Sequence, residues 1–293
     1  MDPKALLERF GRRSEPPAAL KSALDDLARL VPARPDLAGP AATLARLLSA
    51  AFLQPDPMVV PADRLEAMAD ARSAGLVAFQ VAPPRLDGSL INSRGRALAE
   101  ALAVDNPRGR DLATAIRRRR VDLAAWGAEV LAGRPEAVEA GALDLGIEPT
   151  LTSSVLRLAL LPTLARVSSA LEAHRPGIRA DRGDCPDCGS RPLLAESRGL
   201  EQRIVFRCGL CAAEWPGERL RCPSCAEADP KALHYSFIEG EQDRFRLAHC
   251  DTCRYDWKVV ATLTPLSAPA LIVADLASVH LDLLAADPAR QTP

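Results

Sequence analysis

The stretch that decides the fold runs from Cys185-Pro186-Asp187-Cys188 to Cys250-Asp251-Thr252-Cys253. It holds all eight cysteines of the chain in four Cys-x-x-Cys pairs. Such a turn presents two sulfurs on one side of a tight loop, and two turns complete a tetrahedron around one metal ion. The spacing therefore predicts two closed four-thiolate metal sites, whose ligands are Cys185, Cys188, Cys208, Cys211, Cys222, Cys225, Cys250 and Cys253.

The local residues suit metal-binding turns. Proline follows the first cysteine in two of the pairs, and Gly189 follows the first pair directly. Glycine can adopt the positive φ that lets backbone N–H groups turn towards a ligand sulfur. A disulfide framework is the weaker interpretation, because the chain is long, shows no signal peptide and confines its thiols to adjacent pairs.

Two ways of sharing the metals fit the spacing. In the first, neighbouring pairs combine, so that Cys185/Cys188 joins Cys208/Cys211 and the last two pairs form the second site. In the second, a cross-brace joins the first pair to the third and the second to the fourth. We favour the first arrangement, because the segments 203–207, 233–237 and 245–248 alternate as strands do and sequential hairpins build ribbons without threading. It predicts tandem rubredoxin-like or zinc-ribbon-like β knuckles.

The remainder of the chain favours helices. Apolar residues recur at helical spacing over 20–30, 41–53, 63–71, 95–103, 108–120, 121–132, 135–143 and 149–174, after a short amphipathic turn at 6–10. Pro162 should kink or split the longest of these segments. A strand over 255–260 and a C-terminal helix over 270–286 follow the cysteines. We therefore predict an α+β protein with a mostly helical domain over 1–180 and a metal-binding domain over 181–293, joined by the polar stretch 181–184.

Composition and charge narrow the function. The 293 residues have a formal net charge of −1, and no run of 18 apolar residues suggests a membrane span. Residues 181–260 hold 12 Lys/Arg and 14 Asp/Glu, so this metal-binding segment is acidic. Ribbons that bind nucleic acid need an excess of basic residues to displace counterions from phosphates. The charge thus disfavours a nucleic-acid partner, and eight reduced thiols favour the cytoplasm.

The cysteine pattern resembles a known family. Four short motifs carry the resemblance. They are Cys185-Pro-Asp-Cys-Gly-Ser-Arg-Pro192 at the first pair, Glu214-Trp215 after the second pair, Leu233-His-Tyr235 after the third and Ala274-Asp275-Leu-Ala-Ser278 near the end. Over about 185–282 this is similar to the FdhE family of formate dehydrogenase accessory proteins. The sequence departs from the family at Asp256, where an aromatic residue is usual, and at Ala274, where an aspartate is expected.

The resemblance implies a cytoplasmic maturation factor that is not an enzyme. Its partner would be the catalytic subunit of a respiratory formate dehydrogenase, with the twin-arginine signal peptide of that subunit as a further contact. It implies two rubredoxin-type metal ions, with iron favoured and zinc possible. Candidate partner contacts are Glu214, Trp215, Tyr235 and Asp275, although Trp215 suits packing over the metal loop equally well. The alternatives are a zinc-ribbon protein associated with nucleic acid or transcription, and a redox protein.

Overall fold

The helical part of the protein precedes the sheet. The structure, a computed structural model, describes residues 17–177 and 183–286; the predicted turn at 6–10 and part of the stretch 181–184 lie outside them. The helices before the cysteines are α2 (Ala18–Ala33), η1 (Pro35–Leu37), α3 (Ala38–Phe52), α4 (Ala62–Ser73), α5 (Ala78–Val81), α6 (Gly88–Leu102), α7 (Pro107–Arg117), α8 (Leu123–Leu131), α9 (Glu136–Asp144) and α10 (Pro149–His174).

Several of these helices begin where the sequence supplies a cap. The carboxylate of Asp87 accepts the Leu90 N–H at the start of α6, and Asp122 does the same for Ala124 and Ala125 at the start of α8. A side-chain oxygen at this position replaces a missing backbone partner and stabilises the helix by about 1 kcal/mol. The caps therefore fix where these helices start, and the apolar faces of the helices fix how the helices pack.

The cysteine-containing part forms one six-stranded sheet. Its strands lie in the order β3-β2-β1-β6-β5-β4. They are β1 (Pro192–Arg198), β2 (Arg203–Cys208), β3 (Glu214–Pro216), β4 (Leu233–Ser236), β5 (Phe245–Cys250) and β6 (Asp256–Thr262), with η2 (Pro230–Ala232) before β4.

The sheet consists of two similar three-stranded units. In each unit a Cys-x-x-Cys turn precedes the first strand, and a second such turn separates the second strand from the third. Neighbouring strands within a unit are antiparallel, whereas β1 and β6 join the two units in parallel, with Ala195 opposite Val259. The tandem ribbons predicted from the sequence thus share one sheet.

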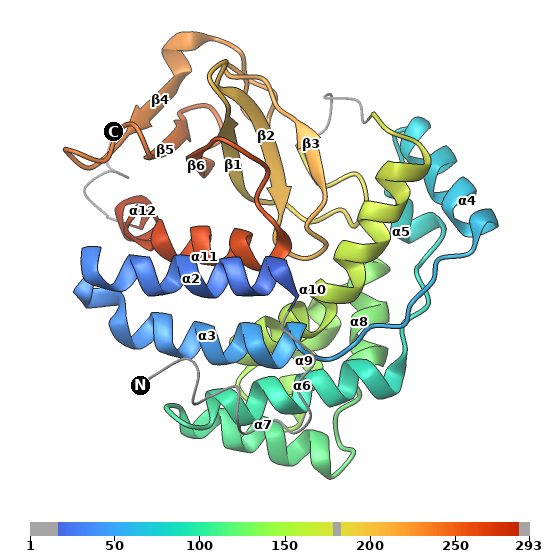
Figure 1. Ribbon diagram of the computed structural model, residues 1–293. Helices are drawn as coiled ribbons and strands as arrows, with labels where there is room; N and C mark the ends of the chain where they lie inside the picture. The colour runs from blue at the N-terminus through green and yellow to red at the C-terminus, as the bar shows by residue number, and fades with distance from the viewer. Residues whose placement is uncertain (1–16, 178–182, 287–293) are drawn as a thin grey trace.

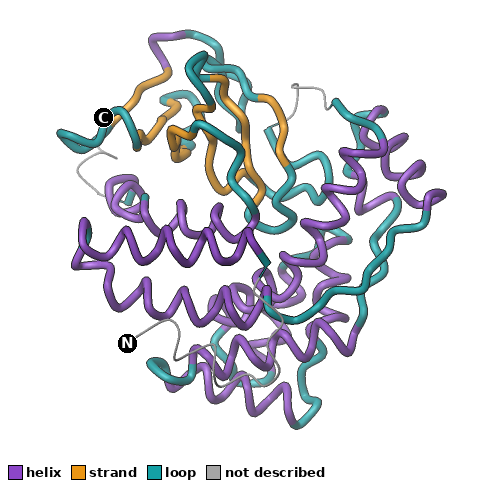
Figure 2. The backbone as a smooth tube through the Cα atoms, viewed as in Figure 1, coloured by secondary structure: helices purple, strands orange, loops and turns teal. Residues whose placement is uncertain are grey.

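Both faces of this sheet are covered. After the sheet, α11 (Ala268–Ala277) and α12 (Val279–Ala285) follow β6, and α11 lies beside α2 between the sheet and α3 (Figures 1 and 2). Leu194 and Val260 on one face join a core with Leu27 of α2 and Leu271 of α11. On the other face, Ala195 joins the larger core that includes α10 and the first cysteines. The predicted α+β fold is confirmed, and the domain boundary at 180/181 stays a prediction.

The structure decides one alternative for Pro162 and corrects one helix prediction. Pro162 does not split α10, which runs as one helix from Pro149 to His174, and a kink there stays a prediction. The proline costs one backbone hydrogen bond, but the buried residues on either side, such as Leu161 and Leu164, hold the helix in the core. The predicted C-terminal helix is instead two helices bent by 53° at Ser278. The Ser278 hydroxyl donates to the Ala274 carbonyl at 2.8 Å and competes with helical bonding there.

One described helix is long and apolar enough to cross a membrane. It is α10, with a mean hydropathy of 1.3 over its most apolar window, and 61% of that window is buried inside the protein. The bent pair α11–α12 passes the same test only when the two helices are taken together. Burial of α10 is what the central helix of a soluble protein shows, since its apolar side chains already contact other helices.

Candidate metal centres

The four Cys-x-x-Cys turns share one hydrogen-bond pattern, and we call each such turn a knuckle. In the first, the Cys185 N–H donates to the Ser190 carbonyl at 2.8 Å and the Gly189 N–H donates to the Cys185 carbonyl at 2.9 Å. The equivalent residues of the other knuckles make the same two bonds, for example Cys222 with Glu227 and Ala226. Each knuckle is therefore closed by its own backbone, which holds its two sulfurs on one side.

The residue after the second cysteine has a positive φ in every knuckle. Gly189 has a φ of +79°, as its residue type predicts, but Ala212, Ala226 and Arg254 adopt +56°, +62° and +61°. This left-handed conformation costs a non-glycine residue about 1–2 kcal/mol. The chain tolerates it at three knuckles because the positive φ lets the carbonyl of the next residue accept the N–H of the first cysteine, while the residue's own N–H donates to that cysteine's carbonyl.

The sulfur atoms gather in two groups of four. Cys185, Cys188, Cys208 and Cys211 form one group, called site 1, and Cys222, Cys225, Cys250 and Cys253 form the other, called site 2. Within each group all sulfurs lie within 4.8 Å of one another. The pairing of neighbouring knuckles is thus confirmed, and the cross-brace alternative is wrong because each sheet unit brings its own two knuckles together.

The donor set fits a tetrahedral metal ion. The Sγ–Sγ distances are 3.5 Å for Cys185–Cys211 and 3.4 Å for Cys188–Cys208, and 3.5 Å and 3.7 Å for two pairs in site 2. Thiolates about 2.3 Å from a common ion lie roughly 3.8 Å apart at the corners of a tetrahedron. All eight cysteines are free of disulfides. Both groups could therefore hold a metal ion after small shifts of the sulfur atoms.

Burial opposes ionisation of several of these thiols in the absence of a cation, whereas hydrogen bonds from neighbouring thiols lower the pKa of the Cys208 thiol. Burial raises the pKa of the Cys185 thiol well above its ordinary range and that of the Cys222 thiol to about 12, with neighbouring thiols adding to both shifts. A bound cation reverses this cost, because it compensates the thiolate charges directly. Binding of a metal ion at either site would therefore be coupled to release of protons from its thiols.

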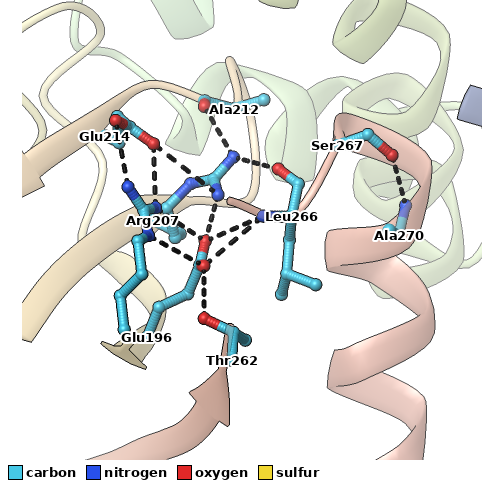
Figure 3. Close-up of polar contacts among 9 residues, drawn as sticks. Glu196, Arg207, Ala212, Glu214, Thr262, Leu266, Ser267 and Ala270 are labelled. Carbon is cyan, nitrogen blue, oxygen red and sulfur yellow. Dashed lines mark hydrogen bonds and ion pairs between the residues drawn. The ribbon is translucent and has the colours of Figure 1, made fainter. Parts of the chain in front are cut away.

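A buried ion network connects site 1 to the start of α11. Figure 3 shows the Arg207 guanidinium between the Glu196 carboxylate and the carbonyls of Ala212 and Leu266. The Glu196 side chain is fully buried and also accepts from Thr262 Oγ1 at 2.9 Å. Because Arg207 precedes Cys208 and Ala212 follows Cys211, the network fixes both ends of the second knuckle.

A second buried pair connects site 1 to the helices. Asp187, inside the first knuckle, has no exposed side-chain surface, and the Arg72 Nε of α4 lies 3.1 Å from its Oδ1. Burial raises the pKa of Asp187 to about 6, whereas the Arg72 charge acts in the opposite direction. Arg72 also contacts Glu172 of α10 at 3.0 Å. These three residues line a cavity of about 410 Å³ between the helices and site 1.

The predicted partner contacts lie in different surroundings. Glu214 is partly exposed and pairs with Arg198 at 2.9 Å, while the neighbouring Trp215 is 1% exposed and packs on Phe206. The structure thus favours the packing interpretation for Trp215. The Tyr235 hydroxyl donates to the Arg219 carbonyl at 2.9 Å. Asp275 forms an ion pair with the buried Lys258 of β6, and Asp282 contacts the same ammonium at 2.8 Å.

Sequence reasoning missed the residues that support the sites. Asp187 was visible within Cys-Pro-Asp-Cys, but its partner Arg72 lies on a distant helix. Glu196 and Arg207 carry no motif, and only their neighbouring strand positions bring them together. A charged residue inside an apolar strand pattern was the available signal, because burial of a charge requires a partner.

These features define a class of protein: a helical body bearing one sheet with two tandem four-cysteine knuckle sites. No family model matches the chain. It is 36% identical over 121 residues to the Protein FdhE homolog of Stutzerimonas stutzeri, covering 39% of this chain and 38% of that protein. It is 33% identical over 110 residues to Protein FdhE of Escherichia coli O127:H6, covering 36% and 35%. The matched segment thus spans under two fifths of these relatives.

The fold comparison extends further along the chain. The crystal structure of the FdhE protein from Pseudomonas aeruginosa matches with a TM-score of 0.62 and covers 93% of this chain and 92% of that one. At 21% sequence identity this match shows the shared fold. The cysteine region is therefore similar in sequence to FdhE proteins, as its pattern predicted, and the whole chain shares the fold of a solved FdhE protein.

Proposed function

We propose that this protein is an accessory factor in the maturation of formate dehydrogenase and is not itself an enzyme. The observation that carries the proposal is the pair of four-cysteine groups on one sheet, in the fold of a solved FdhE protein. The resemblance of the cysteine region to the FdhE family supplies the connection to formate dehydrogenase. Eight cysteines without disulfides would suit the reducing environment of the cytoplasm.

The eight cysteines would hold two metal ions, iron by preference and zinc as the alternative. Four thiolates complete a tetrahedron and leave no coordination position for a substrate, which argues against Lewis-acid hydrolysis. Bound iron supplies one-electron chemistry, whereas zinc supplies structure alone. The residues of the chain would have the same role with iron as with zinc. The knuckles orient the sulfurs, and the Glu196–Arg207 network fixes the second knuckle.

The acidic sheet region suits a basic partner segment. We propose that it contacts the catalytic subunit of a respiratory formate dehydrogenase, including its twin-arginine signal peptide, through Glu214, Tyr235 and Asp275. Trp215 would support Glu214 from within the core. Bound metal adds negative charge, because four thiolates outweigh a divalent or trivalent ion. Charge complementarity of this kind mainly raises the association rate and the specificity of a complex.

Metal analysis tests the first part of the proposal. The full chain, purified without oxygen, is expected to contain about two metal ions per chain. Charge-transfer bands of ferric thiolate in the visible spectrum would identify iron, and a colourless protein with two zinc ions would make the sites structural. A chain with intact thiols that binds neither metal would contradict the proposal.

Copurification tests the second part. The tagged full chain should retain the catalytic subunit of formate dehydrogenase, and retention should weaken in Glu214→Gln and at raised salt concentration. Glu218→Gln serves as the matched control, because Glu218 is a nearby exposed carboxylate that pairs only with Arg221 in the same segment. A catalytic subunit without its signal peptide shows whether that peptide contributes. Equal retention of an unrelated exported protein would refute a specific partner role.

A further inference from the structure

The two four-cysteine sites differ in their exposure to solvent. Every residue of the two site 1 knuckles, 185–188 and 208–211, is buried. In site 2, Cys225 is exposed, Cys253 is half-buried, and Ser224, Asp251 and Thr252 are exposed. We propose that site 2 is the exchange site of the protein, where metal enters and leaves by ligand substitution at Cys225, while site 1 retains its ion. This inference rests on the proposed metal binding.

Local knuckle geometry does not account for the difference. The closing bonds at Cys185 and Cys222 have the same length, 2.8 Å, and connect equivalent residues. The short sulfur–sulfur distances of the two sites are also similar, at 3.4–3.5 Å in site 1 and 3.5–3.7 Å in site 2. The contrast therefore arises from what the rest of the chain places over each site.

Site 1 is covered by the helical part of the protein. At the start of α5, the N–H groups of Ala78 and Phe79 donate to the carbonyls of Pro186 and Asp187 at 3.0 Å and 2.8 Å. The ion pair of Arg72 with Asp187 adds a second attachment to the same knuckle. On the other knuckle, the fully buried Leu210 joins the large core. Opening site 1 thus requires separation of the sheet from the helices.

Site 2 is only partly covered, because Cys222 and Cys250 join the large core whereas Cys225 and Cys253 lie towards solvent. The Thr252 hydroxyl donates to the Glu227 carboxylate at 2.8 Å, and both side chains belong to exposed parts of the two site 2 knuckles. The Asp251 N–H donates to the Ala232 carbonyl at 2.9 Å, beside β4 at the edge of the sheet. Local opening here exposes little apolar surface, so it costs less free energy than opening site 1.

Exchange at site 2 has a simple course. An incoming soft donor, such as a thiolate or a chelating nitrogen, bonds to the ion as the bond between the ion and Cys225 Sγ breaks. The released thiolate takes a proton from solvent, and no electron is transferred. The exposed Cys225 should also react with an alkylating reagent before any cysteine of site 1, because access of the reagent limits the reaction of the buried thiols.

The experiment uses the full chain loaded with two zinc ions, verified by native mass spectrometry. After addition of excess EDTA, samples are pulsed with N-ethylmaleimide and the modified cysteines are located by peptide mapping. We expect a one-zinc species to accumulate, with Cys225 modified at least about tenfold faster than any cysteine of site 1. Simultaneous loss of both ions, or earlier modification of Cys188 or Cys208, would overturn the inference.

Two variants sharpen the test. Thr252→Val removes the Thr252–Glu227 contact without touching a ligand, and it should speed loss of the first zinc ion while leaving the second unchanged. Arg72→Met should instead speed loss of the second. If both substitutions act on the same ion, the assignment of the sites is wrong. A chain that binds no metal before EDTA is added refutes the proposed metal binding itself, so the two failures are distinguishable.

Discussion

Replacing Glu196 by glutamine should destabilise the protein more than any change to a surface charge. The Glu196 side chain is fully buried and that of Arg207 is 5% exposed, so solvent does not compensate either charge. Glu196→Gln leaves the Arg207 guanidinium buried without its carboxylate. Breaking a buried ion pair in this way typically costs 3–5 kcal/mol.

The surroundings place the expected loss at the lower end of that range. Arg207 keeps the carbonyls of Ala212 and Leu266, and the Glu214 carboxylate lies 3.9 Å away. We therefore expect a loss of about 3 kcal/mol in the free energy of unfolding. Against a total stability of about 5–15 kcal/mol, this is a substantial fraction. It corresponds to a fall in melting temperature of about 5 °C, because the unfolding entropy of a chain of this length is roughly 0.6 kcal/mol per kelvin.

The assay is urea unfolding of the metal-loaded chain, followed by circular dichroism at fixed metal concentration. A double-mutant cycle with Arg207→Met isolates the pair, and its coupling energy should reach about 1–3 kcal/mol. Glu218→Gln is the control, because the exposed Glu218–Arg221 pair should contribute less than about 1 kcal/mol. A loss below 1 kcal/mol for Glu196→Gln, with no coupling to Arg207, would refute the reasoning.

Three further predictions concern stability. Ala226→Gly should raise the free energy of unfolding by up to about 1 kcal/mol, because the φ of +62° suits glycine. Urea titration measures this change. Ala159→Gly, within α10, is the control and should lower the free energy of unfolding. Arg94→Met should cost about 3 kcal/mol in the same assay, because it leaves Asp56 without its 3.1 Å partner in the core. Burial alone would raise the pKa of Asp56, but hydrogen bonds from Thr163 and Arg94 lower it. The ionised Asp56 carboxylate therefore stabilises the fold above pH about 4, and acid-unfolding curves should show this stabilisation fading at lower pH. Removal of both ions by a chelator should lower the melting temperature, and readdition of zinc should restore it; an unchanged melting temperature would contradict a structural role of the metals.

Local patterns in the sequence were sufficient to predict the two four-cysteine groups and most helices. The Cys-x-x-Cys spacing specifies the knuckle because its two closing hydrogen bonds lie within six residues, as at Cys185–Ser190. Likewise, the predicted helix over 149–174 has the bounds of α10, since proline and glutamate mark its start and its apolar residues continue to its end. Features of this kind depend on neighbouring residues alone.

The missed features depend on distant residues. The segment 192–198 has no β-branched residue, and it becomes strand β1 because β2 and β6 pair with its two edges. The four residues of α5 are too short for a periodic signal, yet their N–H groups bind the first knuckle. The left-handed Ala212 was likewise invisible, because alanine gives no indication of a positive φ.

The parallel pairing of β1 with β6 explains how two similar units acquire different surroundings. Each unit could form its knuckles alone, because its two cysteine pairs adjoin its own antiparallel strands. Joining the first strand of one unit to the last strand of the other places β1 inside the sheet and leaves β4 at the edge. The knuckle before β1 then meets α5 and Arg72, whereas the knuckle before β4 keeps Cys225 exposed. One strand pairing therefore separates a metal site sealed by the protein core from a site open to exchange.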